Sequence, residues 1–158
     1  MIVVLMGVSG TGKTTVGRLL AHDLGWPFYE GDDYHSAANV EKMGHGIPLT
    51  DADRDGWLTA LRALIDGISG SAVLACSALK ATYRDRLAAG RDDVRFVHLT
   101  GDPALLRRRL EERRGHYMPA SLLDSQLATL EAPADAITVD VGGTPEAIVA
   151  AIRRALGI

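Results

Sequence analysis

The feature that most constrains the fold is the junction between an apolar segment and a glycine-rich loop at the start of the chain. The run MIVVLM is followed at once by GVSGTGKTT, residues 7–15. Beyond the loop, residues 13–24 place Val16, Leu19 and Leu20 on one face at helical spacing. An uninterrupted apolar strand, a tight glycine turn and an amphipathic helix predict a βα unit of a parallel sheet covered on both faces.

The loop from Gly7 to Thr14 has the spacing Gly-x-x-x-x-Gly-Lys-Thr, which is the full phosphate-binding pattern. Its glycines let backbone N–H groups approach an anion, and the following helix N-terminus adds partial positive charge. We expect Lys13 to reach the β- and γ-phosphates and the Thr14 hydroxyl to ligate Mg²⁺. The alternative, an ordinary glycine-rich turn, is disfavoured by the strand before it and the helix after it. The residues expected to bind ATP are Gly7, Ser9, Gly10, Thr11, Gly12, Lys13, Thr14 and Thr15.

Strand-like and helix-like segments go on alternating through the 158 residues. This alternation indicates a single α/β domain, residues 1–158, with a five-stranded parallel sheet flanked by helices. Ligands of such sheets bind at the carboxyl ends of the strands, so residues that follow a strand are candidates for the site. Further strands are expected at 27–30, 72–77, 94–100 and 136–141, and further helices at 37–43, 53–68 with Asp51 as N-cap, 80–87, 103–113, 121–131 and 145–156.

Composition argues against several other classes of protein. A net charge of −3, with only two Trp and two Phe, argues against binding to nucleic acid. No apolar run is long enough to span a bilayer and no basic leader precedes MIVVLM, so we expect a cytoplasmic protein without membrane contact. The single cysteine, Cys76, can form neither an internal disulfide nor a zinc cluster, and we expect it to be buried.

An acidic cluster, FYEGDDYH, spans the end of the second expected strand. The later strand AVLACS carries no acid, so the carboxylate that supports Mg²⁺ must come from elsewhere. Side-chain alternation predicts Glu30 and Asp32 on one side and Asp33 on the other. We assign Glu30 to the water shell of the metal and Asp32 to the attacking hydroxyl, whose proton it accepts. The alternative is a solvated acidic turn.

The segment 31–58, GDDYHSAANVEKMGHGIPLTDADRDGWL, resembles the gluconate kinases closely. It matches the family pattern GDxxH followed by NxxKMxxGxPLxDxDRxxWL. CSALKATYRDRL, RLEERRGHYM and LLDSQLATLEAP resemble further segments of that family, so the resemblance runs from the glycine loop to about Pro133. The departures are Glu30 where the family usually has Asp, and Ser36 and Gly56 where it usually has Pro.

The resemblance implies a three-layer P-loop kinase fold with a helical lid at about 109–125 and an acceptor-binding segment at about 31–58. It also implies in-line, ATP-dependent phosphorylation of D-gluconate at O6, and it suggests a homodimer. Two alternatives stay open. One is another small-molecule kinase of this architecture, such as a shikimate or nucleoside monophosphate kinase, against which the block 39–58 argues. The other is a nucleotide-dependent switch, which would not need an acceptor constellation.

A sugar acid presents a carboxylate at one end and a primary hydroxyl at the other. Arg54 and Arg84 are the candidates for the carboxylate, because a guanidinium matches it bidentately. The candidates for the polyol hydroxyls are His35, Lys42, Ser77 and Lys80. Four of them have a structural alternative: Arg54 could pair with Asp51 or Asp53, Arg84 could pair with Asp85 or a helix neighbour, His35 could cap a helix, and Lys42 could be an exposed helix lysine.

Residues 107–114 contain five arginines and two glutamates, a local charge of +3 in an acidic chain. A solvated helix face with Glu–Arg pairs would account for Arg107 and Arg108. The family resemblance implies a lid, and the VGGTP segment is expected to pass the adenine. In that lid Arg109 lies over the adenine, Arg113 acts with Lys13 on the transferring phosphoryl group, and His116 enters the acceptor pocket on closure.

Overall fold

The computed structural model describes residues 1–113 and 121–158, and the chain folds around one parallel sheet. The five strands lie in the order β2-β3-β1-β4-β5. All neighbouring pairs are parallel, so every strand ends at the same edge of the sheet. The strands are β1 (Ile2–Met6), β2 (Phe28–Glu30), β3 (Ala72–Ala75), β4 (Val94–Thr100) and β5 (Ile137–Asp140).

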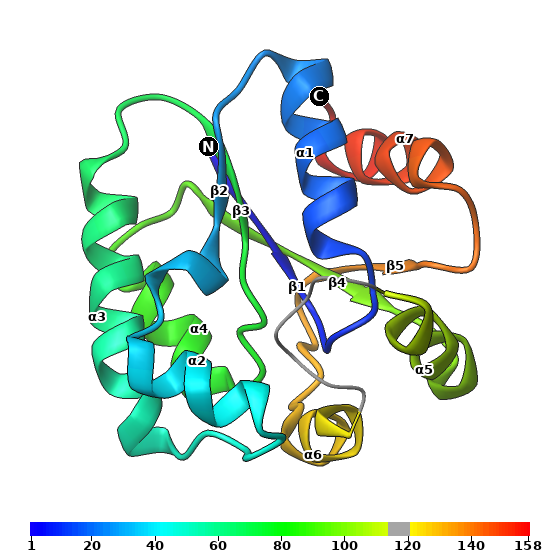
Figure 1. The fold of residues 1–158 in the computed structure, drawn as a ribbon. Helices are drawn as coiled ribbons and strands as arrows, with labels where there is room; N and C mark the ends of the chain where they lie inside the picture. Colours follow the sequence, from blue (N-terminus) through cyan, green and yellow to red (C-terminus); the bar gives the residue numbers. More distant parts are fainter. Residues whose placement is uncertain (114–120) are drawn as a thin grey trace.

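Helices cover both faces of the sheet, which makes three layers (Figure 1). Alternate side chains of β1 divide between the layers: Val3 and Leu5 pack towards α1 and α7, whereas Ile2, Val4 and Met6 pack towards α3 and α4. The expected α/β sandwich with a five-stranded parallel sheet is therefore confirmed. The helices are α1 (Lys13–Leu24), α2 (Ala37–Gly44), α3 (Asp51–Gly67), α4 (Ala81–Ala88), α5 (Pro103–Glu112), α6 (Leu122–Thr129) and α7 (Pro145–Leu156).

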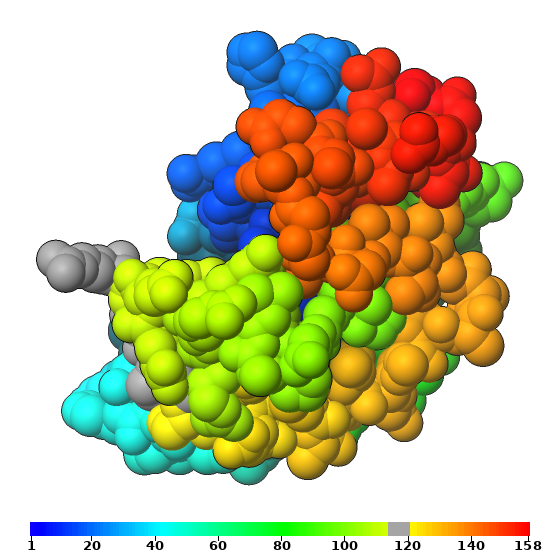
Figure 2. Space-filling model, turned by 90° about the vertical axis from the view of Figure 1, so that its right-hand side faces the viewer, coloured from blue at the N-terminus to red at the C-terminus, as the bar shows by residue number. Residues whose placement is uncertain are grey.

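The space-filling view shows the side of the molecule on which α7 lies above α5 and α6 (Figure 2). In this layer α1 packs against α7, and both contribute to one hydrophobic core. Cys76 belongs to the opposite core, and its burial raises the pKa of the thiol to about 12, as expected for an unreactive apolar residue. Among the described residues, no helix combines the length and apolar character needed to cross a bilayer.

The start of α3 differs from the sequence prediction. Asp51 was expected as the N-cap of a helix beginning at Asp53, but the cap is Thr50. The Thr50 hydroxyl accepts from the Asp53 N–H at 3.1 Å, and the Asp53 carboxylate accepts from the Thr50 N–H at 3.0 Å. This capping box pairs two N–H groups at the helix end, and it leaves the Asp51 carboxylate available for other partners.

The chain leaves the strand conformation directly after Glu30. Residues Gly31–Tyr34 form a short 3₁₀ helix, η1, and Ser36 then caps α2 by accepting from the Asn39 N–H at 3.1 Å. The side chain of Ser36 therefore provides the N-cap that was considered for His35. Gly31 permits the close approach of this turn to β3, because a Cβ there would lie 2.4 Å from the Ala75 carbonyl oxygen.

Candidate active site

The glycine loop after β1 has a backbone conformation that glycine adopts without strain and that suits a phosphate cradle. Gly7 and Gly10 have φ values of 145° and 87°, and a Cβ on Gly7 would lie 2.5 Å from the Leu99 carbonyl oxygen. Lys13, the first residue of α1, folds back so that its Nζ donates to the carbonyls of Gly7 and Val8 at 2.9 and 3.0 Å. The ammonium group therefore lies at the loop, as binding of phosphate oxygens requires.

Carboxylates oppose the desolvation of the Lys13 ammonium. Burial lowers the pKa of Lys13, while the nearby charges of Asp32 and Glu30 act in the opposite direction. Glu30 in turn accepts a hydrogen bond from the Thr14 hydroxyl. Burial raises the pKa of Glu30 in spite of this bond. The loop cation is thus electrostatically coupled to the acids at the end of β2 and in η1.

The Thr14 hydroxyl and the Glu30 carboxylate are the oxygens best placed to hold Mg²⁺. They are in direct contact, and both are the hard oxygen donors that this ion prefers. Within residues 1–113 and 121–158, no group of three or more His, Cys, Asp or Glu side chains forms a metal cluster. These two oxygens fit an ion that takes its remaining ligands from nucleotide phosphates and water.

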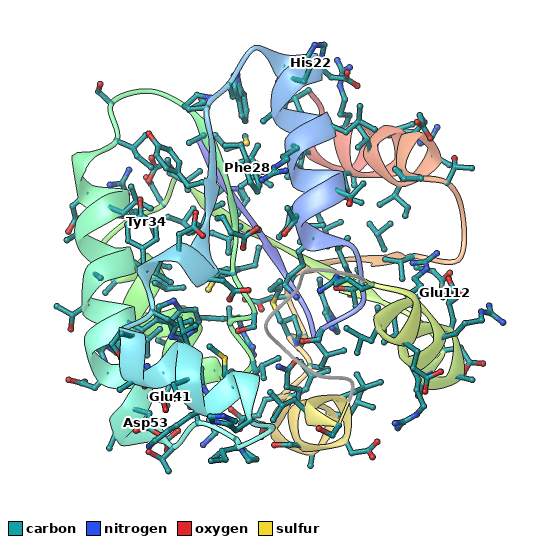
Figure 3. All side chains as sticks on the ribbon, in the orientation of Figure 1. His22, Phe28, Tyr34, Glu41, Asp53 and Glu112 are labelled. Carbon is teal, nitrogen blue, oxygen red and sulfur yellow. The ribbon has the colours of Figure 1, made fainter. Side chains whose placement is uncertain are left out.

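A pocket opens beside the glycine loop at the carboxyl ends of β1, β2 and β3. It brings together side chains from η1, from the α2–α3 region and from α6. In Figure 3, Asp53 lies on the side of α2 and α3, and Glu112 lies on the side of α5. The residues that line it are Ser9, Gly10, Gly12, Lys13, Thr14, Glu30, Asp32, His35, Met43, Pro48, Leu49, Arg54, Trp57, Ser77, Leu79, Arg113, Leu122, Ser125 and Gln126.

The acidic cluster is divided as expected, but for a different reason. Glu30 and Asp32 line the pocket and Asp33 does not. Strand alternation does not explain this division, because the backbone beyond Glu30 is 3₁₀-helical. The turn is held by Trp57, whose indole N–H donates to the Gly31 carbonyl at 2.8 Å. A tertiary contact from α3 therefore keeps the Asp32 segment in place.

His35 is enclosed next to Asp32. Its side chain is 4% exposed, and its ring stacks on Trp57 with centroids 4.3 Å apart and planes 12° from parallel. This burial lowers the pKa of His35 to about 4, against the opposing charge of Asp32 and with a smaller contribution from Arg54 in the same direction. His35 is consequently a neutral imidazole at physiological pH.

Arg54 lines the pocket and is oriented by an aromatic residue. Its Nη1 donates to the Tyr83 hydroxyl at 3.2 Å, and its guanidinium lies 5.5 Å from the centroid of the Tyr83 ring. The Tyr83 hydroxyl donates in turn to Asp51. The alternative that Arg54 pairs with Asp51 or Asp53 is not observed, because these carboxylates bind Lys80 and Lys42. Arg54 therefore lines the pocket without a carboxylate partner among the described residues.

Arg84 is buried and bound to backbone carbonyls outside the pocket, which corrects its assignment as a substrate ligand. The residue is 8% exposed and does not line the pocket. Its guanidinium donates to the carbonyls of Ala78, Leu79 and Glu131 at 2.8, 3.2 and 2.8 Å. It does not pair with Asp85, the alternative considered. Arg84 ties the loop before α4 to the segment after α6.

The two candidate lysines lie outside the pocket lining. Lys42 pairs with Asp53 at 2.9 Å, and Lys80 pairs with Asp51 at 2.9 Å. The bond from Thr50 and the Lys42 ion pair lower the pKa of Asp53 to about 2. Each ammonium group already donates to a carboxylate, so either lysine would contact a bound acceptor only through its remaining N–H or after exchange of this partner. Ser77, the remaining hydroxyl candidate, does line the pocket.

A second hollow adjoins the loop on the side of α5 and α7. Arg109 lines it and donates to the Val141 carbonyl at 2.7 Å, and Arg113 lines both this hollow and the acceptor pocket. Gly143, from the VGGTP segment expected near the adenine, also lines this hollow. Arg107 pairs at 2.6 Å with Asp124 of α6, rather than with a glutamate of its own helix as considered from the sequence. His116 lies outside the described residues. The other lining residues are Gly10, Thr11, Gly12, Thr15, Val16, Pro145 and Ile148.

Gln126 of α6 was not identified from the sequence as a site residue. Its Oε1 accepts from the Ser9 N–H at 2.7 Å and from the Ser9 hydroxyl at 3.0 Å, which joins α6 to the glycine loop. Ser125 and Leu122 of the same helix line the pocket. The segment LLDSQLATLEAP was the available signal, but only the fold brings it to the loop.

The fold and the pocket define a P-loop small-molecule kinase, with a phosphate cradle next to a pocket that holds an acid and an arginine. The sequence matches the family model described as shikimate kinase over residues 9–156. The chain belongs to this family and, within it, to the gluconokinases.

Curated relatives and solved structures support this membership. The chain is 56% identical to a gluconokinase of Gluconobacter oxydans, over 84% of this chain and 76% of the relative. It is 47% identical to a probable gluconokinase of Xenopus tropicalis, over 97% and 92%. A gluconokinase structure from Sinorhizobium meliloti superposes with a TM-score of 0.89 at 43% identity, covering 98% of this chain and 90% of that chain. A shikimate kinase from Aquifex aeolicus, at 20% identity and a TM-score of 0.68 with 99% and 96% coverage, shares the fold.

Proposed function

We propose that this protein transfers the γ-phosphoryl group of ATP to O6 of D-gluconate, giving 6-phospho-D-gluconate and ADP. The observation that carries the proposal is the presence of Asp32 and Arg54 in the pocket that the glycine loop borders. A base near the phosphates and a guanidinium further away match a substrate with a hydroxyl at one end and a carboxylate at the other.

The transfer is in-line. Asp32 orients the 6-hydroxyl and accepts its proton. The hydroxyl oxygen forms a bond to the γ-phosphorus while the bond from phosphorus to the β,γ-bridging oxygen breaks, and ADP leaves with that electron pair. Lys13 and Arg113 stabilise the negative charge on the transferring group. Mg²⁺, when bound, neutralises charge on the β- and γ-phosphate oxygens, and Thr14 and Glu30 would hold it.

The remaining polar groups divide into those that line the pocket and those that do not. His35 and Ser77 line the pocket and are assigned to the polyol, and Arg54 is assigned to the carboxylate. Lys42 and Lys80, which lie outside the pocket lining, are assigned to contacts with the substrate from the margin of the pocket. This proposal includes an acceptor segment at about 31–58 and a lid at about 109–125 that closes over ATP and excludes water.

The direct test is consumption of Mg-ATP with gluconate, shikimate, glucose, nucleoside monophosphates or no acceptor. Turnover restricted to gluconate is expected, with the position of the phosphate determined by phosphorus–proton correlation NMR on the product. Turnover with shikimate instead would reassign the segment 31–58. Nucleotide binding without turnover on any acceptor would indicate a switch rather than an enzyme.

The role of Asp32 is tested by Asp32→Asn, with Asp33→Asn as the matched control. Loss of the general base is expected to lower kcat by roughly 10²–10⁴-fold. Asp33 lies outside the pocket lining, so its substitution should change kcat little. An Asp32→Asn enzyme with near-normal turnover would show that Asp32 is not the base.

A further inference from the structure

Asn39 of α2 joins two parts of the site from a buried position. It is 5% exposed, and its side-chain Nδ2 lies 2.8 Å from the Asp53 carbonyl oxygen and 3.3 Å from Nδ1 of His35. A backbone carbonyl can only accept, so the amide atom facing Asp53 must be the nitrogen. The same NH₂ group has a second hydrogen, and Nδ1 of His35, 3.3 Å from the nitrogen, is placed to accept it.

The contact with Asn39 determines which nitrogen of His35 carries the proton. Because Asn39 donates, Nδ1 must accept and cannot itself be protonated. The proton of the neutral ring is therefore on Nε2. Nε2 lies 4.0 Å from Oδ1 of Asp32; the stack on Trp57 holds the plane of the ring, and the Asn39 contact distinguishes its two nitrogens. The imidazole thus presents an N–H donor to the pocket beside the acceptor carboxylate.

We propose that Asn39 is a positioning residue that holds His35 in the Nε2–H tautomer, so that His35 donates a hydrogen bond to the acceptor hydroxyl oxygen whose proton Asp32 accepts. The separation of 4.0 Å between Nε2 and Oδ1 allows one hydroxyl oxygen to lie within hydrogen-bond distance of both atoms. His35 keeps its proton throughout, and it orients the oxygen lone pairs. This role rests on the proposed function, but the tautomer itself does not.

The surroundings keep the ring neutral. The groups that face it are Asp32 from η1, Asn39 from α2, and Arg54 and Trp57 from α3. Burial is the main cause that lowers the pKa of His35 to about 4, and Asp32 only partly opposes it. A neutral donor suits this site, because an imidazolium would form an ion pair with Asp32 and make that carboxylate a weaker base.

The tautomer is measured on the wild-type protein labelled with ¹⁵N-histidine, by long-range proton–nitrogen correlation NMR without nucleotide or gluconate. His35→Gln identifies the resonances. The expected result at pH 7 is a neutral ring with protonated Nε2 and unprotonated Nδ1, unchanged down to about pH 5. A ring protonated at Nδ1, or charged at pH 7, would overturn the proposal, whichever acceptor the enzyme phosphorylates.

Two variants at one position separate positioning from simple structural support. Asn39→Ala and Asn39→Asp both lose the hydrogen bond to the Asp53 carbonyl, but only the aspartate places an acceptor against Nδ1. With a carboxylate in place of the amide, we expect Nδ1 to become protonated, the pKa of His35 to rise above its ordinary value, and kcat to fall at least about 10-fold further than in the alanine variant.

The outcomes distinguish the proposals. Equal effects of both substitutions on kcat, pH–rate profile and the His35 resonances would reduce Asn39 to a structural contact. If gluconate is not phosphorylated but the wild-type spectrum shows the Nε2–H form, the proposed substrate fails and the assignment of the tautomer stands. Should either variant not fold, the wild-type spectrum still decides the tautomer, and His35→Gln, which keeps a side-chain N–H donor, tests the need for an imidazole donor.

Discussion

Replacement of Arg84 by methionine is expected to weaken the fold and to leave the binding of gluconate nearly unchanged. Arg84 supplies hydrogen bonds to three carbonyls, at distances from 2.8 to 3.2 Å. The Leu79 carbonyl also accepts from the Glu131 N–H at 2.8 Å, so it keeps a partner. The carbonyls of Ala78 and Glu131 lose this donor. Methionine is of similar length and keeps most of the apolar packing.

The magnitude follows from these two carbonyls. A hydrogen bond from a charged group contributes about 1.5–3 kcal/mol, and the removal of a buried charge offsets part of the loss. We therefore expect the free energy of unfolding to fall by about 2–3 kcal/mol. In a domain of this size that corresponds to a decrease in Tm of roughly 4–12 °C. Thermal and urea unfolding followed by circular dichroism measure the change.

Arg54→Met is the matched comparison, because Arg54 lines the pocket and has a side-chain partner in Tyr83. Its loss is expected to raise KM for gluconate by roughly 100-fold, with a change in unfolding free energy below about 1 kcal/mol. Kinetics of both variants are measured at 15 °C, where each remains folded at roughly wild-type levels. An Arg84→Met enzyme with unchanged stability and a greatly raised KM for gluconate would refute the structural assignment of Arg84.

Three further predictions concern helix packing, pH and metal. Gly17→Ala should lower the free energy of unfolding by about 1–3 kcal/mol, because a Cβ there would lie 2.5 Å from the Phe28 ring, which lies between β2 and α1 (Figure 3). Gly56 of α3 faces open space, so Gly56→Ala should raise the free energy of unfolding by up to about 1 kcal/mol. Urea unfolding of both variants measures the two changes. Folding lowers the pKa of His35 to about 4, so below pH 6.5 the unfolded chain binds more protons than the folded one. Between pH 6.5 and 4.5 the free energy of unfolding should therefore fall by about 2–3 kcal/mol more in the wild type than in His35→Gln, as measured by urea unfolding at each pH. Glu30→Gln should raise the Mg²⁺ concentration for half-maximal rate by roughly 10–100-fold, measured at saturating ATP; an unchanged Mg²⁺ requirement would remove Glu30 from the metal shell.

The architecture was predictable because its determinants are local. Apolar strands without polar interruption, the glycine loop and the caps at Asp102 and Thr144 each act within a few residues. The errors arose where two local options compete. At α3, the capping box of Thr50 and Asp53 replaces the expected cap at Asp51. After β2, the strand periodicity ends at Glu30.

The phosphate side of the site was equally accessible from the sequence, since its ligands are consecutive residues of one loop. The acceptor side was only partly accessible. The pattern identified Asp32, His35 and Arg54 as candidates, and these line the pocket. It did not show which basic side chains already bind other residues of the protein. Lys80 binds Asp51, 29 positions away in the chain, and Arg84 binds the carbonyl of Glu131, 47 positions away.

The sequence by itself thus determined the class of fold, the phosphate cradle and the family, all of which depend on residue type and spacing along the chain. The tertiary structure alone decided that Arg54 lies in the pocket and Arg84 supports a loop, that Gln126 reaches Ser9, and that Asn39 reaches the Asp53 carbonyl. The physical reason is that the role of a polar side chain depends on the partners within about 3 Å of it. Those partners come from segments that only folding brings together.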